Sequence, residues 1–194
     1  MLTTILISYL PYAMITAFTP GPNNILALNT MTSYGWKRGK PMILGIASGF
    51  TCVMVICAAG CFGMAGVLPA FTSFMKYIGA AYLIWLAVHI VLSRQDNTES
   101  GGKSSFWNGF LLQFMNVKII LYAVTIYTCY VLPFSRSVPS LAASAFLNTA
   151  VGILGTLTWA MAGNALQSGI GKHRKLFNWA MGIILIWYGI KLVI

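Results

Sequence analysis

The stretch ITAFTPGPNNILAL, residues 15–28, interrupts the first hydrophobic segment of the chain with two prolines that flank a glycine. Pro20 and Pro22 lack a backbone N–H, so neither can bond to the carbonyl four residues earlier in a helix. Each proline also disfavours a helical conformation of the residue before it, and Gly21 tolerates the backbone angles that result. The stretch therefore predicts a half-helix that ends near Phe18, a bend, and a second half-helix with Pro22 in its first turn.

The predicted bend has two ends of opposite polarity. The free carbonyls of the first half-helix suit an ammonium group, and the free N–H groups of the second suit an anion such as a carboxylate. An amino acid stripped of its water needs both kinds of partner. We therefore expect a substrate-binding site made of Thr19, Pro20, Gly21, Pro22, Asn23 and Asn24. The alternative is a kink that only shapes a helix bundle.

The composition of the chain is that of a membrane protein. Of its 194 residues 58% are hydrophobic and 7% are charged, against roughly 25% charged residues in soluble domains. Each apolar segment is long enough to span a bilayer as a helix, and the six segments are 5–28, 41–63, 67–92, 106–132, 138–165 and 176–194. The predicted fold class is an all-α integral membrane protein with one polytopic domain, residues 1–194. The N-terminus lacks the basic region of a cleaved signal peptide.

The basic residues indicate how the chain is oriented in the membrane, and the net charge of +10 needs no nucleic acid to explain it. The first, third and fifth loops hold eight of them, Lys37, Arg38, Lys40, Arg94, Lys103, Lys172, Arg174 and Lys175. The other loops and the C-terminal end hold three, Lys76, Arg136 and Lys191. Because positive charge gathers on the cytoplasmic side, we expect both termini to face outward.

The two halves of the chain resemble each other. LIWLAVHIV at 83–91 matches LIWYGIKLV at 185–193, and FTPGPNNIL at 18–26 is similar to FMNVKIIL at 114–121. If these short similarities are not chance, they predict two inverted three-helix repeats, 1–92 and 106–194, with interrupted first and fourth helices. The binding site of such transporters lies where the interrupted helices meet.

Asn116 and Lys118 lie in the middle of the fourth segment. The only two acidic residues, Asp96 and Glu99, lie in a polar loop, so no carboxylate within a span can pair with Lys118. Their absence from the spans also argues against metal sites and proton relays built on acidic residues. The partners of Lys118 must be carbonyls, amides, water or a bound anion. It can act as a carboxylate ligand, as a proton carrier, or as a polar contact to the first segment.

The motifs TPGPNN in the first segment and Asn116-Val117-Lys118 in the fourth resemble the LysE/RhtB family of bacterial amino-acid exporters, over the whole chain. The family's second motif usually reads Asn-Pro-Lys. The valine here, with NVKIILY and YVLPFS, looks like the branch that exports cysteine and O-acetylserine. The resemblance implies an exporter in the bacterial inner membrane, driven by an ion gradient and without an ATP-binding domain, so that the outward-facing termini expected from the basic residues would be periplasmic. A threonine or homoserine exporter is the alternative within the family.

Other residues leave rival functions open. Cys52, Cys57, Cys61 and Cys129 all lie in predicted spans, where they suit apolar packing, a thiol–disulfide relay or soft-metal export. We favour packing, and therefore expect neither an enzyme nor a cofactor or metal site. The expected partners are a small amino-acid substrate and lipid, without nucleic acid. Gly45 and Gly49 predict close helix packing, either within the chain or in a homo-oligomer.

Reporter fusions test the predicted topology. Fusions after Arg38, Gly101 and His173 are expected to report a cytoplasmic location, and fusions near Arg136 and at the C-terminus an external one. A cytoplasmic C-terminus would contradict both the six-span count and the inverted repeat.

Overall fold

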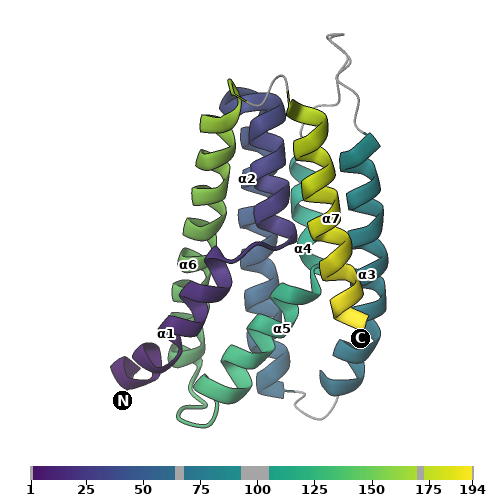
Figure 1. The fold of residues 1–194 in the computed structure, drawn as a ribbon. Coiled ribbons are helices and arrows are strands. Elements are labelled where there is room, and N and C mark those ends of the chain that lie inside the picture. The colour runs from purple at the N-terminus through teal and green to yellow at the C-terminus, as the bar shows by residue number, and fades with distance from the viewer. Residues whose placement is uncertain (1, 64–67, 93–104, 170–172, 194) are drawn as a thin grey trace.

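The computed structural model describes residues 2–63, 68–92, 105–169 and 173–193, and every regular element in these ranges is a helix (Figure 1). The elements are α1 (Leu2–Phe18), α2 (Pro22–Gly63), α3 (Leu68–Leu92), α4 (Phe106–Met115), α5 (Val117–Thr125), the π-helix η1 (Ile126–Val131), α6 (Val138–Leu166) and α7 (Arg174–Val193). The polar loop that contains Asp96 and Glu99 lies outside the described residues.

The break predicted in the first hydrophobic segment is confirmed. Helix α1 ends at Phe18 and α2 begins at Pro22, with the residues between them in a non-helical conformation. The fourth segment is also broken, because α4 and the helix that follows it are bent by 57°. The bend occurs at Asn116, whose φ of −85° and ψ of 89° are not helical, although no proline is present there.

The first hydrophobic segment extends further than predicted. It was expected to end at residue 28, but the helix runs on to Gly35, whose φ of 65° reverses the chain. A side chain at this position would be strained and would also meet Gln167, since an ideal Cβ lies 2.7 Å from its Oε1 atom. The two arms of α2 therefore lie side by side (Figure 1). The predicted loop WKRGK is the start of the second arm.

Glycines bring the second arm of α2 against α4. An ideal Cβ at Gly49 would lie 2.5 Å from the carbonyl oxygen of Phe110, and one at Gly45 would overlap that of Phe106. Gly109 of α4 meets the carbonyl of Met42 in the same way. Such close approach of two backbones is typical of helices packed in membranes. Gly45 and Gly49 thus pack within the chain, which answers the question left open by the sequence.

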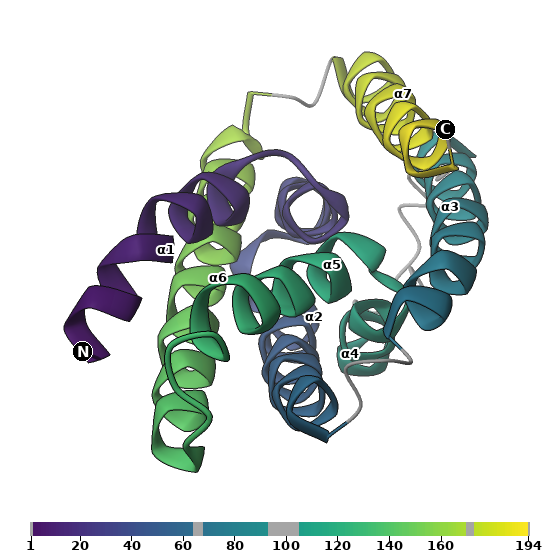
Figure 2. The same cartoon turned by 90° about the horizontal axis from the view of Figure 1, so that it is seen from below.

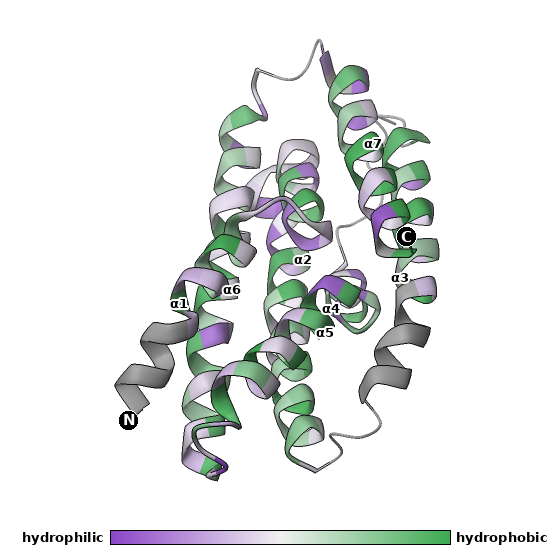
Figure 3. Cartoon of the chain, turned by 60° about the horizontal axis from the view of Figure 1, so that its bottom comes forward, coloured by the Kyte–Doolittle hydropathy of each residue, from purple (hydrophilic) through white to green (hydrophobic). Residues whose placement is uncertain are grey.

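The remaining helices complete a bundle with an apolar surface. Figure 2 shows α3 and α7 as a pair at one side of the molecule, in contact mainly with each other. Hydrophobic residues run along the helices (Figure 3), and many are exposed, among them Ile15 at 66% and Phe146 at 79%. Such a surface suits lipid better than water.

The predicted count of six spans is only partly tested. Among the described residues, two stretches are long and apolar enough to cross a membrane, Tyr9–Gly63 and Val138–Leu166. The bent pair Phe106–Met115 and Val117–Val131 makes a third if it is one span. The six-span count and the repeat of 1–92 in 106–194 stay predictions.

Candidate functional site

Lys118, in the first turn of α5, reaches the break between α1 and α2. Its Nζ atom donates to the hydroxyl of Thr19 at 3.1 Å and to the carbonyls of Thr19 and Pro20 at 3.4 and 3.3 Å. Gly21 lies against this side chain, because an ideal Cβ there would be 2.9 Å from Nζ. The two motifs singled out in the sequence therefore meet, and the lysine has backbone carbonyls as partners, one of the options predicted for it.

Two other side chains pair the carbonyls at the end of α1. The Asn24 amide donates to the carbonyls of Ala17 and Thr19 at 2.8 and 2.9 Å. The indole N–H of Trp159, in α6, donates to the carbonyl of Phe18 at 3.1 Å. Groups of the protein therefore already donate to the carbonyls that were expected to bind a substrate ammonium. Their pairing satisfies the requirement that broken backbone in a membrane be bonded internally.

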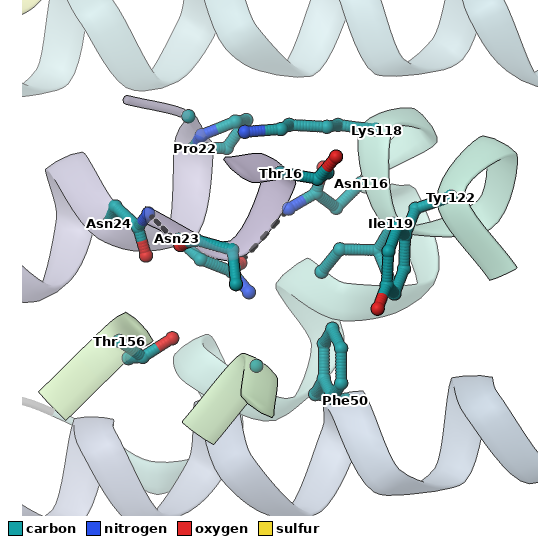
Figure 4. Close-up of a pocket in the computed structure, with 13 residues that line it drawn as sticks. Thr16, Pro22, Asn23, Asn24, Phe50, Asn116, Lys118, Ile119, Tyr122 and Thr156 are labelled. Atoms are coloured by element: carbon teal, nitrogen blue, oxygen red, sulfur yellow. Dashed lines mark hydrogen bonds between the residues drawn. The ribbon is translucent and has the colours of Figure 1, made fainter. Parts of the chain in front are cut away.

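A chain of buried amides joins the two helix breaks. Asn116 donates from Nδ2 to Oδ1 of Asn23 at 3.0 Å (Figure 4), and Asn23 donates to Gln113 at 2.8 Å. Gln113 in turn donates to the carbonyl of Gly109 at 2.9 Å. Among the described residues, none donates to the buried Oδ1 atom of Asn116. A buried acceptor without a donor costs about 1–3 kcal/mol, so this oxygen is the unsatisfied end of the amide chain.

Asn23, Asn24, Asn116 and Lys118 line a cavity of about 50 Å³. Six of the eight residues predicted as the site line this cavity, namely Gly21, Pro22, Asn23, Asn24, Asn116 and Lys118. The other two, Thr19 and Pro20, do not line it but accept hydrogen bonds from Lys118. Residues that sequence reasoning missed complete the wall, namely Thr16, Ala17, Phe50, Ile119, Tyr122, Gly152 and Thr156. Thr16 and Thr156 are polar residues inside the first and fifth hydrophobic segments, and this polarity is a signal from which the sequence could have predicted them.

The N-terminus of α2 points its positive end at the same cavity. The first backbone N–H that has an acceptor in this turn is that of Ile25, which bonds to the carbonyl of Gly21 at 2.9 Å. The N–H groups of Asn23 and Asn24 have no acceptor within the helix, as is normal for a first turn. Together with Lys118 they give one side of the cavity a positive potential.

A buried network of tyrosines adjoins the cavity on the side of the N-terminal half of α1. The hydroxyl of Tyr122 donates to Oδ1 of Asn148 at 2.5 Å, and the amide of Asn148 donates to Ser144 and Tyr9. The Tyr12 ring stacks on that of Tyr122 with centroids 5.9 Å apart. Tyr9 and Asn148 are fully buried, so this side of the cavity is packed.

The opposite side adjoins two further cavities. A cavity of about 30 Å³ shares Pro22, Asn116 and Lys118 with the central one. It also shares Tyr82, Leu112 and Met115 with a third cavity of about 330 Å³ between α2, α3 and α4. The polar residues of this third cavity include Asn29, Ser33, His89 and Asn108. The three cavities thus form a series from the centre toward the end of the molecule that bears the basic turn after Gly35.

Comparison with known proteins relates the chain to one family of transporters. Residues 14–194 match a family model described as LysE type translocator. The chain is 40% identical over 195 residues to a cysteine/O-acetylserine efflux protein of Klebsiella pneumoniae subsp. pneumoniae, which covers 100% of both chains. It is 36% identical over 194 residues to the cysteine/O-acetylserine efflux protein of Escherichia coli strain K12, which covers 99% of both. No solved structure matches the chain.

Asn24→Leu tests the pairing at the break. The change leaves the carbonyl of Ala17 without its donor, while Lys118 still donates to the carbonyl of Thr19. We expect a loss of about 1–3 kcal/mol in the free energy of unfolding, the cost of a buried carbonyl without a partner. The measurement is the denaturation curve of purified protein in detergent, with Asn108→Leu at an exposed position as the matched control. Equal denaturation curves for the two variants would contradict the role of Asn24 in pairing the carbonyl of Ala17.

Proposed function

The chain belongs to the LysE type translocator family, whose members are transporters rather than enzymes, and we propose that its cargo is cysteine and O-acetylserine. The names of its relatives support this choice, and the chain matches these relatives over nearly their full length. An exporter of threonine or homoserine type is the alternative within the family.

The observation that carries the proposal is the unpaired Oδ1 of Asn116 beside a positive helix end. We assign the ammonium of a zwitterionic amino acid to this oxygen. We assign its carboxylate to the first-turn N–H groups of Asn23 and Asn24 and to Lys118, groups that favour negative charge. The central cavity of about 50 Å³ has room for only a few water molecules, which favours a cargo with a short side chain.

The arrangement also supports a six-span exporter built from two inverted repeats. The helix breaks at 19–21 and at Asn116 occupy corresponding places in the halves 1–92 and 106–194, and their side chains meet at one cavity. Interrupted helices that meet at a central site are typical of such transporters. We place both termini in the periplasm, from the distribution of Lys and Arg. The series of cavities would then admit the substrate from the cytoplasm.

Efflux from cells tests the cargo. Cells that overproduce the chain are loaded with labelled cysteine, O-acetylserine, threonine or homoserine. We expect efflux of the first two to rise above that of cells with an empty vector, and efflux of the other two to stay unchanged. A rise confined to threonine and homoserine would replace the proposed cargo by the alternative, and no rise for any of the four would overturn the proposal.

Substitutions of Lys118 test its role in binding the carboxylate. Lys118→Met keeps the length and removes the charge, so we expect it to lower efflux at least about tenfold, since a hydrogen bond to a charged group is worth about 1.5–3 kcal/mol. Lys118→Arg keeps the charge in a different shape and should retain part of the activity. Efflux is measured per amount of membrane-inserted protein, with exposed Lys40→Met as the control. Near-normal efflux by Lys118→Met would assign the lysine to packing, because removal of a buried charge is then tolerated.

A further inference from the structure

The central cavity has a polar wall, and across from it a wall that contains Phe50, Gly152 and Thr156. Asn23, Asn116 and Lys118 form the polar wall, and Phe50 lies across from them (Figure 4). Gly152 lies on the same side as Phe50, because an ideal Cβ at Gly152 would be 2.6 Å from two atoms of the Phe50 ring. An amino acid whose charged groups bind the polar wall must therefore direct its side chain toward Phe50.

The Phe50 ring is held in a fixed position. It is 7% exposed and belongs to a buried cluster that includes Val53, Met54 and Val151. Behind the ring lies the α6 backbone at Gly152, where the missing side chain makes the room that the ring fills. Because protein interiors are closely packed, the ring has little space into which it can withdraw. It therefore acts as a rigid boundary rather than an adjustable one.

We propose that Phe50, seated on Gly152, determines how large a side chain the exporter accepts. This inference rests on the proposed function, because it assumes that the central cavity holds the amino acid. An amino acid whose side chain extends no further than the Phe50 ring fits the cavity. An amino acid with an aromatic side chain does not. Phe50 is on this view a specificity-determining residue that contacts the cargo without contributing a charge or a hydrogen bond.

Two substitutions should change the selectivity in opposite directions. Phe50→Ala removes a phenyl ring from the cavity wall, and the space it leaves suits the phenyl ring of a phenylalanine substrate. We expect the ratio of phenylalanine efflux to cysteine efflux to rise at least about tenfold, the scale on which hydrophobic pockets discriminate by size. Gly152→Ala adds a methyl group where the ring now lies and pushes the ring into the cavity. It should lower efflux of O-acetylserine, the longer cargo, about tenfold more than efflux of cysteine.

Controls separate selectivity from folding. Phe146→Ala, at a phenylalanine of α6 that is 79% exposed, should leave both ratios unchanged. Phe50→Leu, a milder change, replaces Phe50→Ala if the latter fails to insert in the membrane. Competition in the unmodified protein needs no variant at all, since O-acetylserine should inhibit cysteine efflux and phenylalanine should not.

The outcomes distinguish this inference from the function on which it rests. Inhibition of cysteine efflux by phenylalanine in the unmodified protein would overturn the role of Phe50, and so would unchanged ratios in inserted Phe50 and Gly152 variants. In both cases cysteine export itself would stand. Absence of cysteine export by the unmodified protein would instead overturn the proposed function.

Discussion

The non-helical backbone between α1 and α2 must have its carbonyl groups paired inside the protein, because lipid offers no donor. Three helices supply the donors. Asn24 comes from α2, Trp159 from α6 and Lys118 from α5, and each reaches carbonyls within residues 17–20. The hydroxyl of Thr19 itself pairs a further carbonyl, that of Thr16, at 3.0 Å. The break thus holds α2, α5 and α6 around one point, and the cavity lies beside that point.

The same pairing decides what the cavity can bind. Since the carbonyl end of α1 is occupied, its negative potential is used within the protein, and the positive end of α2 is left toward the cavity. Among the described residues of the lining, Asn116 has a buried Oδ1 atom without a donor, and its Nδ2 atom donates to Asn23. Under the proposed function, Lys118 would pair both the carbonyls of the break and the carboxylate of the cargo. A carboxylate that binds Lys118 would compete with the carbonyls of Thr19 and Pro20 for its N–H groups. Binding of cargo would then weaken the hydrogen bonds between α5 and the end of α1.

The sequence predicted the limits of the first break closely, because the two prolines lack the N–H groups that a continuous helix from Phe18 to Pro22 would need. It predicted the second break at Asn116 only through the likeness of the two halves. The partners of the break were harder to predict. No local pattern in the sequence shows that the indole of Trp159 reaches the carbonyl of Phe18. Phe50 and Gly152 were not recognised, because the wall of a cavity and a packed core use the same apolar residues.

Lys118 lies 99 residues after Thr19 and 98 after Pro20, and this spacing matters while the protein is being made. A nascent chain emerges with its N-terminus first, so the broken helix is in the membrane before the lysine is synthesised. A lysine that enters lipid alone costs roughly 2.5–3.5 kcal/mol. The carbonyls that accept from Lys118 therefore belong to a segment that is synthesised before it.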